Sequence, residues 1–295
     1  MSGKTTATAI SYGGATIINA IATGKGAAFG VKLWTKAEVK LTDSPPIIKG
    51  EIVSDPAENT ILIEKTVNKI LRYFGLADKF GAEVKTWSNI PIARGLKSSS
   101  AAANAIALAT VAALGKEVDD LTVVNLGVEG ALEAKVTVTG AFDDACASYF
   151  GGIVITDNLK RKIIKRLEAP ENLTVLFHIP KNKVYTSSVN VQKTRAIAPL
   201  VKIAYKEALK GNFWQALTLN GLIYSSALGY DSSIVLDALM AGATAAGLCG
   251  KGPAVTIVVA EEKIDGVREA LMQYEGEIIE TQINHEKAQV LGVSP

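Results

Sequence analysis

Cysteine and histidine are scarce in this chain. Its 295 residues include two cysteines, Cys146 and Cys249, and two histidines, His178 and His285. Two cysteines are too few for a disulfide framework, and neither has a partner at metal-ligand spacing. They are therefore predicted to be small, buried, apolar residues. His178 stands in an apolar run, which favours a place in the core over a catalytic role.

A strong charge of one sign and a long hydrophobic run are also missing. The formal net charge is +2, from 31 basic and 29 acidic residues, and no basic block indicates a nucleic-acid partner. No apolar run is long enough to cross a membrane, and residues 1–6 lack the apolar region of a signal peptide. A cytoplasmic protein without a membrane partner is expected. The composition, 48% hydrophobic and 20% charged, is that of a globular protein with two domains or one large one.

What the chain does contain is a loop with one glycine and three serines before an alanine-rich helix. The loop reads Pro-Ile-Ala-Arg-Gly-Leu-Lys-Ser-Ser-Ser-Ala over residues 91–101, between a strand expected at 83–90 and a helix that should end at Gly115. The first turn of a helix has unpaired N–H groups and the positive end of the dipole, and Arg94 and Lys97 add positive charge. The loop is predicted to bind phosphate, although serine is also a favoured N-cap.

This loop resembles the nucleotide loop of the GHMP kinases, the group of galactokinase, homoserine kinase, mevalonate kinase and phosphomevalonate kinase. Most members carry glycine where this chain has Lys97, and the Lys-Ser-Ser-Ser variant is similar to that of the archaeal-type shikimate kinases. The resemblance implies an α+β fold of two domains with the active site between them. It also implies that these residues bind the nucleotide: Pro91, Ile92, Ala93, Arg94, Gly95, Leu96, Lys97, Ser98, Ser99, Ser100 and Ala101.

The segment of residues 7–26, rich in small and hydroxyl residues, resembles the first GHMP motif. Asn19 takes the position that lies near the substrate hydroxyl in that family. From the residues alone, glycine-rich turns between strands fit equally well. Residues 22–30 are similar to the version found in archaeal-type shikimate kinases, and Lys25 is a candidate to bind an anionic substrate.

A second glycine loop, Gly-Leu-Cys-Gly-Lys-Gly-Pro-Ala over residues 247–254, resembles the third GHMP motif. That motif supports the phosphate loop from the second domain, so Gly250 and Gly252 are expected to contact the nucleotide. Lys251 is unusual within the motif and could contact a phosphate or the substrate carboxylate. Without the resemblance, a hairpin-like glycine turn would be favoured.

Two adjacent carboxylates, Asp143 and Asp144, precede a run of small residues and a Gly-Gly pair at residues 151–152. They suit a base at the edge of a pocket, but a turn with a helix cap fits the local pattern slightly better. The resemblance implies that one of them is the catalytic aspartate. The Asp-Asn-Ala step of the family favours Asp143, while counting back from the glycine pair leaves Asp144 open.

The resemblance also implies a Mg²⁺ site. Glu133 lies ten positions before Asp143, as the metal-binding glutamate of the family does, and Ser99 matches the ligand serine. Glu129, one helical turn earlier, is the rival of Glu133, for which a solvated helix charge is the plain alternative. One carboxylate, one hydroxyl and nucleotide oxygens are ordinary Mg²⁺ ligands.

The clearest strand is at residues 29–41, where apolar and polar residues alternate, so one face should be buried and the sheet antiparallel. Helices are expected at 59–74, 121–136, 198–210, 212–224, 232–246 and 264–274, and further strands at 47–53, 153–156, 163–167, 173–179, 255–260 and 277–282. Strands followed by helices without strict alternation indicate an α+β fold. The expected domains are residues 1–160 and 161–295.

The activity that the resemblance implies is phosphoryl transfer from ATP, with Mg²⁺, to the hydroxyl of a small molecule. Loop N–H groups, Lys97, Arg94 and Mg²⁺ would stabilise charge, and Asp143 would bind the hydroxyl and accept or orient its proton. The substrate favoured by the N-terminal segment and by Lys97 is shikimate, phosphorylated on its 3-hydroxyl in aromatic amino-acid biosynthesis. Homoserine and then mevalonate are the alternatives, and so is a non-catalytic ligand sensor of the same fold.

Overall fold

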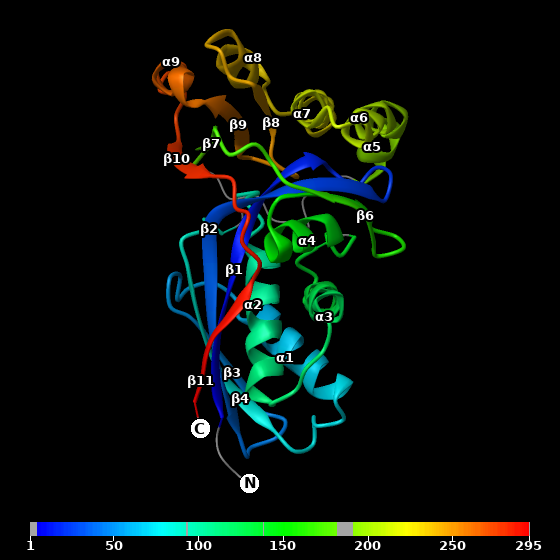
Figure 1. Cartoon of the computed structure of the whole chain (residues 1–295), viewed down its shortest axis with the longest axis vertical. Coiled ribbons are helices and arrows are strands. Elements are labelled where there is room, and N and C mark those ends of the chain that lie inside the picture. Colours follow the sequence, from blue (N-terminus) through cyan, green and yellow to red (C-terminus); the bar gives the residue numbers. More distant parts are fainter. Residues whose placement is uncertain (1–4, 93, 138, 182–190, 295) are drawn as a thin grey trace.

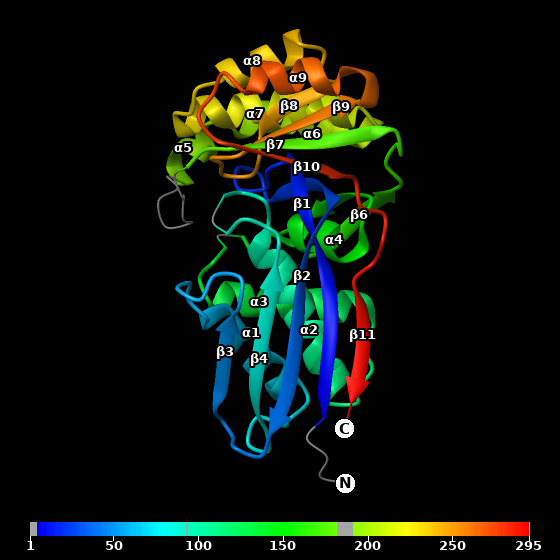
Figure 2. The same cartoon turned by 90° about the vertical axis from the view of Figure 1, so that its left-hand side faces the viewer.

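The computed structural model describes residues 5–92, 94–137, 139–181 and 191–294. Within these residues the chain forms two sheets, one above the other in Figure 1, and each carries helices on one face (Figures 1 and 2). The mixed architecture confirms the predicted α+β class. No helix in the described part of the chain combines the length and the apolar character that a membrane span requires.

The first sheet is built around one long, bent strand, β2. Its described strands follow the order β11–β1–β2–β4–β3, with β5 on β2 and β6 on β5. Pairing is antiparallel except between β3 and β4. The bounds are β1 Thr6–Ile18, β2 Lys25–Thr42, β3 Ile48–Ile52, β4 Gly81–Ser88, β5 Ile153–Asp157, β6 Lys162–Leu167 and β11 Gln289–Ser294. One half of β2 pairs with β4 and the other with β5, so β2 links the far end of the sheet to the junction with the second sheet.

Helices α1, α2 and α4 pack on one face of the first sheet, with α2 at the centre, and α3 packs on these three helices. The bounds are α1 Ile61–Tyr73, α2 Ser98–Ala113, α3 Asp120–Glu133 and α4 Phe142–Phe150. Helix α2 contacts β1, β2, α1, α3 and α4. Its alanines, Ala101, Ala103, Ala105, Ala107 and Ala109, are buried, and their small side chains let the helix approach the sheet closely. The N-terminus of α2 is thereby fixed at the junction between the two sheets.

The second sheet is smaller and fully antiparallel, in the order β10–β7–β9–β8. Its strands are β7 Leu173–Ile179, β8 Ala245–Leu248, β9 Val255–Ala260 and β10 Glu277–Gln282. The helices of this half are α5 Val191–Ala196, α6 Ala198–Lys210, α7 Phe213–Leu228, α8 Ser233–Met240 and α9 Ile264–Leu271, and a 3₁₀ turn covers Glu261–Lys263. Helix α7 packs against both β8 and β1, so it joins the two sheets.

A single hydrophobic core crosses the junction. It contains Ile17 and Phe29 from the first sheet, Phe177 and Leu248 from the second, and Tyr224 from α7, all nearly or fully buried. Burying a side chain of this size stabilises the fold by about 1.5–3 kcal/mol. The ends of β1 and β2 are therefore held firmly against the second half of the chain.

Most predicted elements are present within a few residues of their expected bounds, but one helix was predicted too long. The run 232–246 is a helix only to Met240, and residues 245–248 form strand β8. The alanines there favour a helix locally, but all four residues of β8 are buried in the sheet, so tertiary packing overrides the propensity. Strand β11 was not predicted. Strands β6 and β11 follow residue 160 and belong to the first sheet, and the boundary at residue 160 stays a prediction.

Candidate active site

The first element of the site is the turn that starts α2. Lys97 is the N-cap residue and has a left-handed backbone, with φ 65° and ψ 27°. This conformation costs a residue other than glycine about 1–2 kcal/mol. No side chain in the described part of the chain caps the first turn, which contains Ser98, Ser99 and Ser100. The free amides and the positive end of the dipole make this turn suited to an anion.

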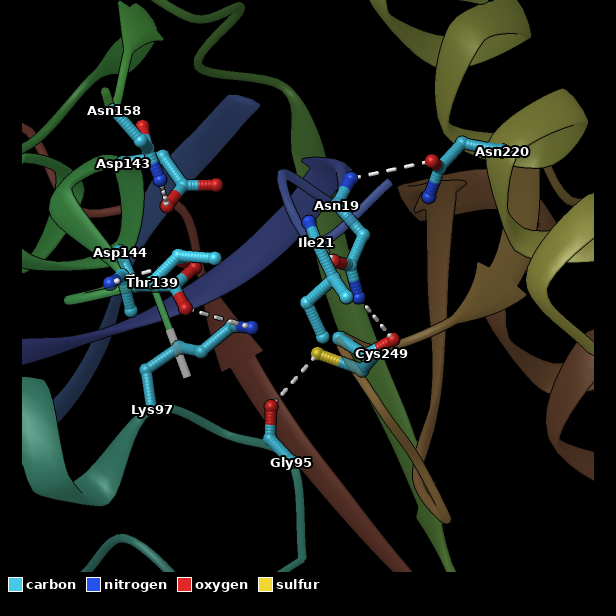
Figure 3. Close-up of polar contacts among 12 residues, drawn as sticks. Asn19, Ile21, Gly95, Lys97, Thr139, Asp143, Asp144, Asn158, Asn220 and Cys249 are labelled. Atoms are coloured by element: carbon cyan, nitrogen blue, oxygen red, sulfur yellow. Dashed lines mark hydrogen bonds and ion pairs between the residues drawn. The ribbon is translucent and has the colours of Figure 1, made fainter. Parts of the chain in front are cut away.

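Gly95 brings this turn close to the second glycine loop. It has φ +96°, and a Cβ there would lie 2.7 Å from the carbonyl oxygen of Cys249, so a side chain would collide with backbone. The thiol of Cys249 donates to the carbonyl of Gly95 at 3.1 Å. The loops expected to share the nucleotide phosphates are therefore in direct contact (Figure 3).

The side chain of Lys97 points away from the turn and pairs with Asp144 on α4. Its Nζ lies 3.1 Å from Oδ2 of Asp144, and both side chains are nearly buried (Figure 3). Burial alone lowers the pKa of Lys97, but the charge of Asp144, followed by Cys249 and Asp143, outweighs it, so the pKa is raised. Lys97 is therefore protonated at neutral pH. Removing one partner of such a buried pair costs about 3–5 kcal/mol, because the other charge is left uncompensated.

Asp143 lies beside this pair but in a different environment. Its side chain is only 3% exposed, and its Oδ1 accepts a hydrogen bond of 2.7 Å from Nδ2 of Asn158. Burial and then the charge of Asp144 raise its pKa to about 7, although Asn158 and Lys97 act in the opposite direction. A carboxylate with this pKa can accept a proton near neutral pH.

Asn19 ties the end of β1 to the second glycine loop. Its Nδ2 donates to the carbonyl of Gly250 at 2.8 Å, and its Oδ1 accepts from the amide of Ile21 at 2.9 Å. The backbone N–H of Asn19 donates to Oδ1 of Asn220 on α7 at 3.1 Å. The Asn19 amide nitrogen thus holds the Gly250 loop, while its oxygen fixes the turn that follows β1.

A cavity of about 570 Å³ connects these elements, a size that suits a small molecule. The predicted site residues that line it are Asn19, Ile92, Gly95, Lys97, Ser98, Ser99, Ser100, Asp143, Gly250 and Lys251, with Asp144 beside them. Apolar side chains from β3, α1 and α2 also line it: Ile52, Ile61, Leu62, Ile63 and Ile106. The cavity therefore offers an anion-binding turn, two carboxylates and an apolar surface together.

The other predicted residues that the structure describes are not part of this lining. Leu96 and Ala101 are fully buried, and Ala93 lies outside the described residues. Pro91 is the first residue of the first loop, and Gly252 lies within the second. Arg94 donates through Nη1 to the carbonyl of Pro180. Lys25 is exposed, with Nζ 5.8 Å from the centre of the Tyr205 ring.

The predicted metal ligands are separated in the structure. Ser99 lines the cavity, but Glu133 does not, and its carboxylate lies 2.8 Å from Nζ of Lys69 on α1. Glu129 contacts the same lysine at 3.1 Å and also Arg161 at 2.8 Å. In the described part of the chain no three His, Cys, Asp or Glu side chains converge on one point. Ser99 is therefore in the cavity lining, apart from Glu133, whose carboxylate is engaged by Lys69.

Sequence reasoning missed several residues of the site. Thr16 at the end of β1 lines the cavity with a buried hydroxyl, and Asn158 holds Asp143 from the end of β5. Lys135 and Thr139, from the loop before α4, also line the cavity. Thr16 lies in the glycine-rich segment of residues 7–26, and Thr139 lies just before the aspartate pair, so motif neighbourhood could have indicated these two. Asn158 and Lys135 belong to no motif, and only the fold brings them to the site.

Comparison with known proteins agrees with this architecture. Residues 61–152 match the family model of the GHMP kinases N-terminal domain. The shikimate kinase of Methanosarcina mazei is 48% identical over 95% of both chains, and that of Pyrococcus furiosus is 46% identical over 85% of this chain and 91% of its own. Among solved structures, the mevalonate kinase of Methanococcus jannaschii superposes with a TM-score of 0.76 at 19% identity, covering 94% of this chain and 98% of that one. Homoserine kinase from Cytophaga hutchinsonii gives 0.72 at 16%, covering 99% and 98%.

The solved structures, at these identities, speak for the fold alone, and that fold is the one of the GHMP kinases. The relatives extend over nearly the whole chain and are much more similar. The chain belongs to the GHMP kinase family, within the group of archaeal shikimate kinases.

Proposed function

We propose that this protein is a shikimate kinase, which transfers the γ-phosphoryl group of ATP to the 3-hydroxyl of shikimate in aromatic amino-acid biosynthesis. The observation that carries the proposal is a shared cavity: the anion-binding first turn of α2 and the buried carboxylate of Asp143 line the same space. The archaeal relatives named shikimate kinase, similar over 95% of the chain, support the choice of substrate.

The nucleotide phosphates would lie on the first turn of α2. Ser98, Ser99 and Ser100 present hydroxyls and amides there, and the Gly250 loop adds backbone from the opposite side. The apolar side chains of β3 and α1 in the lining suit the flat, apolar faces of a nucleotide base. In this role Arg94 supports the loop from Pro180 and does not touch the phosphates directly.

The two carboxylates would divide the chemistry between them. Asp144 forms the ion pair with Lys97, which fixes both charges beside the phosphate turn. Asp143, with a pKa of about 7, is suited to take the proton of the attacking hydroxyl. Asp144 is engaged by Lys97, whereas Asp143 accepts a hydrogen bond from the Asn158 amide. This division favours Asp143 over Asp144 as the base.

The carboxylate of shikimate needs a cation inside the cavity, and Lys251 is the best placed of the predicted candidates. It lines the cavity from the Gly250 loop, whereas Lys25 is exposed. Burial, and then the charge of Lys97, lower the pKa of Lys251 to about 8. A bound carboxylate would raise that pKa again, so substrate binding and protonation of Lys251 support each other.

Mg²⁺ would arrive with the nucleotide and supply charge neutralisation of the transferred phosphoryl group. We expect Ser99 to contact it, and its position in the cavity lining at the first turn of α2 supports this. The part of Glu133 in this site stays a prediction, since its carboxylate is paired with Lys69.

The test is release of ADP, coupled to a spectrophotometric reporter, with ATP, Mg²⁺ and one acceptor at a time. Shikimate should support turnover, and homoserine and mevalonate should not. Phosphorus NMR of the product should then show a phosphate ester on the 3-hydroxyl. Turnover with another alcohol would support the kinase activity but refute shikimate as the substrate. Nucleotide binding without turnover on any acceptor would oppose the kinase proposal itself.

A further inference from the structure

A short relay of hydrogen bonds runs from strand β5 into the carboxylate of Asp143. Asn158 directly follows β5, and its Nδ2 donates to Oδ1 of Asp143 at 2.7 Å. Thr156, within β5, donates through its hydroxyl to Oδ1 of Asn158, also at 2.7 Å. Asp143 and Asn158 are 3% exposed and Thr156 is fully buried, so water does not compete for these bonds. Figure 3 shows the amide of Asn158 facing Asp143.

The hydroxyl of Thr156 decides which way the amide of Asn158 points. A donor beside Oδ1 holds the amide oxygen towards Thr156 and leaves the NH₂ group for the carboxylate. The other acceptor in reach of this hydroxyl is the carbonyl of Gly26, at a longer 3.3 Å. If the amide turned over, its oxygen would face the carboxylate of Asp143, and two acceptors would oppose each other. Thr156 therefore favours the orientation in which Asn158 donates.

The backbone fixes Asn158 and Asp143 on both sides. The N–H of Asn158 donates to the carbonyl of Gly24 at 2.8 Å, and β5 pairs with the start of β2. On the other side of the carboxylate, Gly26 packs so closely that a Cβ there would lie 2.1 Å from Oδ2 of Asp143. The carboxylate is thus held between an amide donor and a glycine backbone.

We propose that Asn158, oriented by Thr156, is the positioning residue of Asp143. It holds the carboxylate in one orientation and favours its ionised form. This inference rests on the proposed function, in which Asp143 is the base. In that reaction the acceptor oxygen bonds to the γ-phosphorus, the bond from phosphorus to the bridging β–γ oxygen breaks, ADP leaves, and the hydroxyl proton passes to Asp143.

Several other groups near Asp143 also influence whether its carboxyl group is ionised or protonated. Burial and Asp144 oppose ionisation of Asp143, and Lys97 favours it together with Asn158. The Cys146 thiol on α4 and the Tyr224 hydroxyl on α7 also lie near; burial is the main cause of their raised pKa values, and the charge of Asp143 adds to it. Both stay protonated at neutral pH. Asn158 therefore supplies one of the interactions that favour the ionised form of the carboxylate, beside the charge of Lys97 and the backbone N–H of Asp144.

The experiment compares pH profiles of kcat and of kcat/KM for the full-length enzyme with ATP, Mg²⁺ and shikimate. Four substitutions are made: Asn158→Ala, Thr156→Val, Thr156→Ser and Asp143→Asn. Losing the Asn158 donor should raise the pKa of Asp143, so the acidic limb of the kcat profile should move up by about 1 pH unit. Valine has almost the shape of threonine but lacks the hydroxyl. Thr156→Val should therefore move the acidic limb of the kcat profile in the same direction as Asn158→Ala, but by a smaller amount. Thr156→Ser keeps the hydroxyl and should retain the wild-type limb.

A merely structural role would give a different pattern. Activity would then fall equally at every pH, together with the thermal midpoint, and Thr156→Ser would be as impaired as Thr156→Val. That result, or an acidic limb that does not move in Asn158→Ala, overturns the inference. If Asn158→Ala does not fold, the pair of Thr156 variants decides. Asp143→Asn distinguishes failure of the proposed function from failure of this inference. If Asp143→Asn keeps wild-type turnover, the assignment of Asp143 as the base fails. If Asp143→Asn loses turnover while the acidic limb of Asn158→Ala does not move, only the role of Asn158 fails.

Discussion

Replacing Gly26 by alanine tests the geometry around Asp143 without touching a functional group. A Cβ at this position would lie 2.1 Å from Oδ2, 2.6 Å from Cγ and 2.9 Å from Cβ of Asp143. Carbon and oxygen need about 3.3–3.6 Å even in a close contact, so the carboxylate must shift by about 1 Å or more. Asp143 cannot move freely, because Asn158 holds its other oxygen and the residue is buried.

A displacement of about 1 Å can cost 10²-fold in rate, so kcat should fall by about that factor while KM for ATP changes little. The assay is steady-state ADP release with shikimate, accompanied by thermal unfolding. Gly13→Ala is the matched control: Gly13 lies in the neighbouring strand β1, and its added Cβ would meet only side chains, at 3.1 Å and beyond. The control should keep its kcat. Wild-type kcat in folded Gly26→Ala would refute the geometry argued for Asp143.

Three further predictions concern the charged groups of the cavity. Asp143→Asn should lower kcat by about 10²–10⁴-fold with nucleotide binding retained. Because the folded-state pKa of Asp143 is raised to about 7, ionising it costs more in the folded than in the unfolded chain, so stability is lost as pH rises from about 4 to about 7. The variant should therefore unfold at a higher temperature than wild type at pH 8 and show a smaller gain at pH 5. Lys97→Gly should relieve about 1 kcal/mol of backbone strain but leave Asp144 unpaired at a cost of about 3–5 kcal/mol, so calorimetry should show a net loss of stability and kinetics a higher KM for ATP. Lys251→Met should raise KM for shikimate about tenfold, which is about 1.4 kcal/mol, with a smaller effect on KM for ATP; equal effects on both would place Lys251 at the phosphates instead.

The elements of the site that local physics dictates were predictable from the sequence. The alanine run and the three serines indicated α2 and its first turn, and the alternation at residues 29–41 indicated β2. Both features are set by residues that are neighbours in the chain, through helix propensity and the two-residue period of a strand. The two adjacent aspartates were expected at a pocket edge or at a helix cap, and both lie in the first turn of α4. The pattern did not reveal that one would be paired with Lys97 and the other buried against Asn158.

What the sequence could not provide was the set of contacts between distant segments. Asn158 reaches Asp143 only because β5 pairs with β2, which lies about 130 positions earlier in the chain. Glu133 was chosen by its spacing from Asp143, but the packing of α1 on α3 gives its carboxylate a nearer partner in Lys69. Arg94 was expected at the phosphates because it stands in the loop, yet the chain turns its side chain to the carbonyl of Pro180. A charged residue in a motif can interact with several different partners, and which partner it contacts depends on the fold.

The charges of the cavity explain why the site would need its backbone amides. Among the described residues of the lining, three lysines, Lys97, Lys135 and Lys251, stand against three acids, Glu58, Asp143 and Asp144. The side chains are therefore close to neutral as a set when all six are ionised, and they do not supply an excess of positive charge for a polyphosphate. Lys97 is in addition already paired with Asp144. The favourable field for the nucleotide has to come from the first-turn amides of α2 and from a cation that the nucleotide brings with it. This balance also bears on the proposed base: a more positive cavity would hold more phosphate but would lower the pKa of Asp143 and weaken its affinity for the hydroxyl proton.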